Sequence, residues 1–278
     1  AAQSVGGGMM AAGFGAGAAV AALASGAGFA GVGNGNTGGA TKDQIVQWFT
    51  RLSANKEGVL FENTLVQIGL KTQYQGTKGR LQLFVGNKSA GALTDFAVDV
   101  SWIHGLSGVC SASSGVIEPR QQMQLTVTAD CLKPFCGSPA LTVSFMSPDG
   151  PTKMDLHLPI VAGKFLEQHT VSKADFDASW GRCIHQGSPV TVPSTDKWMK
   201  DETLRALLSN GIHLGLVEGE VAVAHGAANF KGEHQEALVY AKVAADKGSK
   251  AVKIAVASDN SDLKSALEDQ LKMLLAKK

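Results

Sequence analysis

Histidine and cysteine side chains are the groups of this sequence that could act as bases, nucleophiles or metal ligands, and their spacing supports none of these roles. No HxxxH or HExxH pattern is present, and no GxSxG turn could present a nucleophilic serine. We therefore predict a protein that is not an enzyme, with no catalytic residue, no metal and no cofactor. The seven histidines are scattered, at His104, His157, His169, His185, His213, His225 and His234.

The four cysteines form no CxxC pair and have no zinc-ligand spacing to a histidine cluster. We interpret Cys110, Cys131, Cys136 and Cys183 as reduced, isolated thiols. Cys131 and Cys136 could form a disulfide in an oxidising compartment, but no basic segment precedes an apolar run that would export the chain.

The first part of the chain is uncharged and rich in Gly and Ala up to Thr41. A membrane helix near residues 9–32 is an alternative, but glycines interrupt that stretch and it holds few large apolar residues. We predict a flexible, disordered hinge over residues 1–44, reaching roughly 35 Å. Because the chain opens on Ala1 rather than Met, we expect a part upstream of it, and no transmembrane segment.

Short alternating runs between residues 58 and 160 predict a β-sandwich subdomain of the immunoglobulin-like kind over residues 45–162. Aliphatic residues recur at every second position, with polar residues between them, as expected for sheets with one buried face. The clearest triplets are Val66/Ile68/Leu70, Leu81/Leu83/Val85 and Met123/Leu125/Val127.

Helical and strand patterns mix after Pro159 and predict an α+β platform subdomain over residues 163–278. We expect helices at 173–183, at 200–209 and from Asp259 as N-cap, with the last one burying a leucine stripe. We expect strands at 212–217, 220–224, 237–244 and 251–257. The hinge between the two subdomains should lie near Ala162–Gly163.

Several short runs resemble the alpha-adaptin appendage, or ear, of the plasma-membrane clathrin adaptor complex. In the sandwich they are GVLFEN (58–63), QIGLK (67–71), GR (79–80) and FVGNK (84–88). At the junction and in the platform they are LPI (158–160) and KF (164–165), followed by Phe176 and Trp180.

The resemblance implies an appendage that recruits endocytic accessory proteins by binding their short linear motifs. In this family the platform takes Asp-Pro-Phe, Asp-Pro-Trp and Phe-x-Asp-x-Phe peptides, and the sandwich side takes Trp-x-x-Phe peptides. The implied partners are disordered epsin-like, amphiphysin-like and auxilin-like proteins, the other adaptor subunits through an upstream trunk, and, indirectly, the clathrin coat. The implied location is the cytosolic face of the plasma membrane at coated pits.

The family's sandwich-side site uses a lysine, an aromatic residue and a glutamine, which correspond here to Lys71, Phe84 and Gln122. The alternation supports this, because each lies on the face opposite its strand's aliphatic residues and should point outward. An outward Phe84 would offer a ring to a peptide Trp or Phe. The alternative is a lone surface aromatic, or one that a loop covers.

In the platform, the resemblance implies that Trp180 receives a peptide Phe, beside Phe176 and the basic residues Lys242 and Lys253. Without the resemblance, a Phe/Trp pair at i and i+4 is more often part of a core. The sequence also departs from the family, which has arginines at the two lysine positions, an aromatic where Asp177 stands and a basic residue where Ala257 stands. We therefore expect a weaker or altered platform site.

Other classes of protein remain as alternatives. A beta-type or coatomer appendage is the nearest, followed by a structural lobe that assembles permanently into a larger coat complex. With a net charge of +1, the chain has no field that would suggest nucleic-acid binding.

Overall fold

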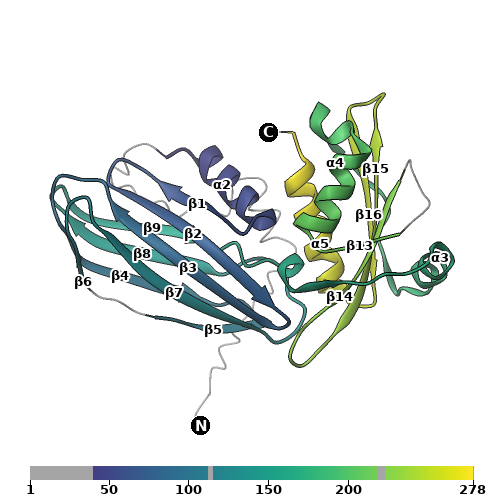
Figure 1. Cartoon of the computed structure of the whole chain (residues 1–278), viewed down its shortest axis with the longest axis horizontal. Helices are drawn as coiled ribbons and strands as arrows, with labels where there is room; N and C mark the ends of the chain where they lie inside the picture. The colour runs from purple at the N-terminus through teal and green to yellow at the C-terminus, as the bar shows by residue number, and fades with distance from the viewer. Residues whose placement is uncertain (1–39, 112–114, 218–222, 278) are drawn as a thin grey trace, which may run out of the picture.

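The computed structural model describes residues 40–111, 115–217 and 223–277. Figure 1 shows two parts: a sandwich of two sheets, and a platform in which one sheet carries helices on both faces. The predicted β-sandwich followed by an α+β platform is confirmed. Residues 1–39, most of the predicted hinge and the whole alternative membrane stretch, lie outside the described residues. Within the described ranges, no helix is long and apolar enough to cross a membrane.

The sandwich pairs a five-stranded sheet with a four-stranded sheet, and all neighbouring strands are antiparallel. Along the three central strands of the larger sheet, more buried and less buried residues alternate because one face packs on the smaller sheet and the other faces solvent. The larger sheet has the order β1 (Glu57–Glu62), β2 (Val66–Gln75), β3 (Lys78–Asn87), β7 (Gln122–Cys131), β5 (Leu106–Cys110). The smaller has the order β6 (Gly115–Ile117), β4 (Leu93–Ser101), β8 (Ala140–Ser147), β9 (Gly150–His157).

The platform is a seven-stranded antiparallel sheet. Its main path is β10 (Leu166–Gln168), β14 (Ala224–Phe230), β15 (Ala237–Asp246), β16 (Ala251–Ser258), β11 (His185–Gln186), while β12 (Val190–Pro193) also pairs with β16 and β13 (Gly215–Leu216) with β14. Helices α4 (Asp201–Ala206) and α5 (Ser261–Leu275) lie between this sheet and the sandwich, and α3 (Lys173–Arg182) lies on the outer face (Figure 1). Side chains of α3 can therefore form part of a binding surface on the outer face of the platform sheet.

Helix α2 (Lys42–Ala54) precedes the first strand and was not predicted. It begins with a capping box, in which Thr41 caps the backbone N–H of Gln44 and the Gln44 side chain accepts from the Thr41 N–H. Ile45, Phe49 and Leu52 bury one face of the helix in the core. The first three residues of the helix thus fall within the predicted hinge.

The two cores merge at the junction between the subdomains. Tyr74 of β2 and Phe135 both pack edge-on against Phe165, with ring centroids 5.3 and 5.9 Å away, and Phe135 also packs on Phe230 of β14 at 6.4 Å. Phe165 ends the short 3₁₀ helix η2 (Ala162–Phe165), which contains the predicted hinge residues. All four of the η2 residues are buried, so the junction is a packed contact.

Three expectations for the platform need correction. The strand expected at residues 212–217 is only the two-residue β13, because the chain of α4 continues as a π-type turn, η4 (Leu207–Gly211), with the 3₁₀ helix η3 (Asp196–Met199) preceding α4. The strand expected at 220–224 falls mostly on residues outside the described ranges, and the real strand is β14, from Ala224. The N-cap of α5 is Asn260, whose side chain accepts from the Leu263 N–H, rather than Asp259.

Candidate functional site

Lys71, Phe84 and Gln122 lie on the solvent face of the larger sandwich sheet, on the neighbouring strands β2, β3 and β7. Lys71 and Gln122 are exposed and Phe84 is half-buried. Lys71 pairs directly with Gln82, and Gln122 pairs with Gly86, so each lies diagonally across from Phe84. Diagonal neighbours on one face are about 7–8 Å apart, within reach of long side chains. The strand register therefore brings these three residues together.

Two glycines leave the Phe84 ring accessible. Gly69 is the direct partner of Phe84 on β2, and Gly86 follows two residues later on the same face of β3. Neither has a side chain to cover the ring. A Cβ added at Gly69 would lie 3.9 Å from the Cβ of Phe84, an ordinary contact, so these glycines are not needed for backbone packing.

Among the described residues, the interaction that holds the Lys71 side chain is a solvent-exposed ion pair. Its Nζ lies 3.5 Å from a carboxylate oxygen of Glu57, and both side chains are more than half exposed, at 61% and 68%. Such pairs contribute little to stability because water screens them. Lys71 can therefore exchange Glu57 for the carboxylate of a ligand at small cost.

Phe176 is the buried base of the outer platform surface. It is fully buried and stacks on His225 of β14, with ring centroids 4.8 Å apart, and packs edge-on against Tyr240 of β15 at 5.5 Å. No local pattern predicted these two neighbours, because they come from strands that are distant along the chain. Phe176 accordingly supports the surface from below and does not face solvent.

Trp180 lies above Phe176 at the end of α3 and is only partly buried. The two rings stack with centroids 5.9 Å apart, and the ammonium of Lys242 lies 4.3 Å from the Trp180 ring centroid. This cation–π contact places a positive charge against the Trp180 ring.

Asp177 also lies close to the Lys242 ammonium. It forms an ion pair with Lys242, 3.9 Å apart, and another with Lys173 one turn earlier. The hydrogen bond from Lys173 is the main cause that lowers the pKa of Asp177, so the carboxylate is charged at neutral pH. Lys242 is thus partly neutralised from within the chain. Ala257, by contrast, is fully buried beneath Phe176, in the same apolar cluster.

Lys253 lies on the same sheet face as Lys242 but further from Trp180. Lys242 pairs with Ala255 and Lys253 pairs with Ala244, so the two lysines are diagonal neighbours on β15 and β16. Lys253 is exposed and forms an ion pair with Asp246 at 3.3 Å.

The cysteines show no arrangement for chemistry. All four are free thiols, so the alternative bridge between Cys131 and Cys136 is not formed. Burial raises the pKa of Cys131 to about 12, and of Cys136 and Cys183 to about 11, which keeps them protonated and unreactive. In the part of the chain that the structure covers, no group of three or more His, Cys, Asp or Glu side chains is placed to hold a metal.

Comparisons with known proteins match the sandwich most directly. The family model for the "Adaptin C-terminal domain" matches residues 56–157. The AP-2 complex subunit alpha-2 of Dictyostelium discoideum is 35% identical over 178 residues, which are 63% of this chain and 18% of that protein. The protein of the same name from Arabidopsis thaliana is 28% identical over 177 residues, 63% of this chain and 17% of that protein.

Among solved structures, the GAE domain of GGA2p from Saccharomyces cerevisiae has a TM-score of 0.34 at 9% identity, covering 38% of this chain and 97% of that one. The chain spans about a fifth of the length of the curated relatives. From the family match over the sandwich and the identity to these alpha subunits, we conclude that this chain carries an alpha-adaptin appendage domain.

Proposed function

We propose that this domain is the appendage of a clathrin-adaptor large subunit that recruits endocytic accessory proteins by binding their short linear motifs. The observation that carries the proposal is the diagonal of Lys71, Phe84 and Gln122 on an open sheet face. An accessible aromatic ring between an amide and a loosely held ammonium suits a short peptide with an aromatic anchor. We assign no catalysis to it.

The sandwich side is the stronger of two peptide sites in this proposal. The ring of Phe84 packs against the Trp or Phe of a Trp-x-x-Phe motif, in the space that Gly69 and Gly86 leave. The Gln122 amide pairs with a peptide backbone group, and Lys71 meets an acidic residue beside the motif. Each of these contacts uses a group that the fold leaves available.

The platform is the weaker site. Trp180 receives the Phe or Trp of Asp-Pro-Phe, Asp-Pro-Trp or Phe-x-Asp-x-Phe peptides, Phe176 holds Trp180 from below, and Lys242 and Lys253 attract the acidic residues. Asp177 opposes this attraction, because it pairs with Lys242 and repels a peptide carboxylate. Lysines also lack the planar fork with which arginine binds a carboxylate.

Single motifs should bind weakly, because ordering a disordered peptide offsets much of the contact energy. Two sites on one domain let a partner with repeated motifs bind by effective concentration. We therefore propose as partners epsin-like, amphiphysin-like and auxilin-like disordered proteins, with the clathrin coat engaged indirectly. The place of action is the cytosolic face of the plasma membrane, where other adaptor subunits join through an upstream trunk and the residues before α2 act as the tether.

The rival assignments have less support. The relatives reported above are alpha subunits, which favours this type over a beta-type or coatomer appendage. A permanent assembly lobe would self-associate or require a partner to stay soluble, so sedimentation of the isolated chain as a monomer would argue against it.

Isothermal titration calorimetry against both peptide classes tests the proposal. Phe84→Ala and Gln122→Ala should abolish or weaken binding of a Trp-x-x-Phe peptide by roughly tenfold or more, since hot-spot residues contribute about 2 kcal/mol or more. Trp180→Ala should affect only Asp-Pro-Phe peptides. Met146→Ala, which removes an exposed apolar side chain on the opposite sheet, is the matched control. Undiminished Trp-x-x-Phe binding by Phe84→Ala would remove the side site from the proposal.

A further inference from the structure

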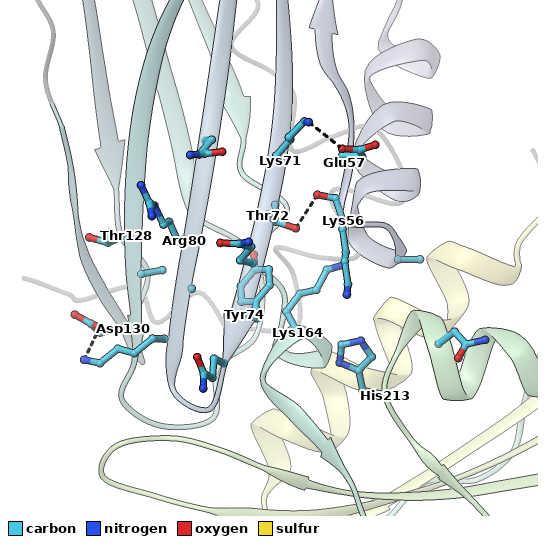
Figure 2. Close-up of a pocket in the computed structure, with 18 residues that line it drawn as sticks. Lys56, Glu57, Lys71, Thr72, Tyr74, Arg80, Thr128, Asp130, Lys164 and His213 are labelled. Carbon is cyan, nitrogen blue, oxygen red and sulfur yellow. Dashed lines mark hydrogen bonds and ion pairs between the residues drawn. The ribbon is translucent and has the colours of Figure 1, made fainter.

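A groove between the sandwich and the platform collects positive charge, and Lys71 is the one of its cations that also belongs to a peptide site proposed above. Its volume is about 930 Å³. One wall is the solvent face of β2, β3 and β7, and the other is formed by the junction residues Lys56, Lys164 and His213 (Figure 2).

The groove has a larger excess of positive over negative side chains than the chain as a whole. The whole chain has a formal net charge of +1, yet five cationic side chains and two carboxylates line the groove. Both carboxylates are already paired, Glu57 with Lys71 and Asp130 with Lys78. The cations without a carboxylate partner among the described residues are Lys56, Arg80 and Lys164.

Lys164 is a buried cation with an incomplete set of partners. Its side chain is 6% exposed, and its ammonium donates one hydrogen bond, of 3.1 Å, to the carbonyl of Asn55 at the end of α2. An ammonium has three protons to donate. A charged group in such a position is costly to bury unless an opposite charge compensates it.

The side chains of Lys56 and His213 both lie near the end of the Lys164 side chain (Figure 2). Figure 2 shows the ends of the Lys56 and Lys164 side chains turned toward each other, with the His213 ring just below them. Burial, followed by the charge of Lys56, lowers the pKa of Lys164 to about 8, and burial, followed by the charges of both lysines, lowers the pKa of His213. The backbone keeps Lys56 in place, since its carbonyl accepts from Thr72 of β2.

We propose that Lys56, Lys164 and His213 form a binding site for a phosphate group. Two lysines and an imidazole that converge on one point match a compact anion with more than one charge, whereas a single carboxylate would neutralise only one of them. The groove leads from this point along the sheet toward Arg80, which leaves room for the rest of a phosphorylated molecule. A small soluble phosphate ester or a phosphorylated serine in a peptide would supply the same group.

Calorimetric titration at pH 7 and constant ionic strength, in a buffer without phosphate, tests this site. The probes are inorganic phosphate and a short Gly/Ser peptide with one phosphoserine and no aromatic residue, so the result is independent of the peptide sites proposed above. Saturable binding to phosphate alone indicates a small ester as the source, and tighter binding to the peptide indicates a phosphorylated chain. Absence of saturable binding to both overturns the proposal.

Three variants locate the binding. Lys56→Gln removes an exposed cation, and His213→Asn keeps a residue type that tolerates the left-handed backbone at this position, where φ is 62°. Each should weaken binding by roughly tenfold, the size expected for a charge-assisted hydrogen bond. Lys153→Gln removes an exposed lysine on β9 and should change nothing. Equal affinity in all three variants would place the anion elsewhere and refute the site.

Proton uptake provides a second readout. A bound anion favours the charged form of Lys164, so the protein should take up protons when it binds phosphate at pH 8. This uptake is measured as a difference in the heat of binding between buffers of different ionisation enthalpy. Lys164→Met should abolish this uptake. Binding without any uptake, in a chain that circular dichroism shows to be folded, would exclude Lys164 from the site.

Discussion

Gln270 of α5 joins three segments at the junction, and replacing it should loosen the attachment of the platform to the sandwich. Its side chain is 2% exposed, and its carbonyl oxygen accepts from the Gly163 N–H in η2 at 3.2 Å. Its amide nitrogen donates to the carbonyl of Ser53 in α2 at a longer 3.5 Å. Gln270→Leu keeps the approximate volume and removes both bonds.

The expected cost of Gln270→Leu comes mainly from the buried Gly163 N–H that loses its acceptor. A buried unsatisfied group costs about 1–3 kcal/mol, and the 3.5 Å bond adds little. We expect a loss of about 2 kcal/mol in the free energy of unfolding. For a domain of this size the unfolding midpoint should fall by roughly 4–8 °C. Gln121→Leu, at an exposed position, should stay within about 0.5 kcal/mol of the wild type.

Gly163 allows a double-mutant cycle on the same contact. A Cβ at this position would lie 2.4 Å from the carbonyl oxygen of Gln270, so Gly163→Ala should be destabilising by itself. In a Gln270→Ala background the clashing atoms are absent, and the same change should cost at least about 1 kcal/mol less. Circular dichroism melts and urea titrations measure both quantities. Additive costs, or a Gln270→Leu variant with unchanged stability, would refute the reasoning.

Two further predictions concern charged residues. Asp177→Asn should tighten binding of Asp-Pro-Phe peptides about two- to fivefold, the effect of one screened ion pair, because Lys242 becomes available. Calorimetry measures this change, with the exposed Glu202→Gln variant as the control. Weaker peptide binding by Asp177→Asn would contradict the prediction. The pKa of Lys164 is about 8 in the folded chain and 10.5 ordinarily. Between these values the unfolded chain binds more protons, so the stability contribution of Lys164 rises from pH 8 to 10.5. Urea titrations should lose this rise in Lys164→Met, and an unchanged pH slope in that variant would contradict the assignment.

The sandwich was predictable because the central strands of its larger sheet each have one buried face. In β2 and β3 the burial alternates from residue to residue, and the alternation of aliphatic and polar types follows it. Helix α2 was also within reach of sequence reasoning, since Thr41 and Gln44 have capping-box spacing, but the Gly/Ala-rich run before them obscured it.

The platform was harder to predict because its sheet is covered on both faces. All but one residue of β14 are buried, and its sequence, AHGAANF, has no alternation and only one strong strand former, Phe230. The segment forms a strand because it packs between α3 on the outer face of the sheet and α4 and α5 on the inner face. Tertiary context here overrides local preference.

The sequence by itself determined which face each candidate residue of the sandwich takes, because that depends only on a period of two along one strand. Only the tertiary structure decided that Lys71, Phe84 and Gln122 meet on a diagonal, that Phe176 lies beneath Trp180, and that Asp177 shares Lys242. Lys56, Lys164 and His213 come together from three segments far apart in the chain. Strand register and the docking of the two subdomains depend on such long-range contacts, and no local pattern encodes them.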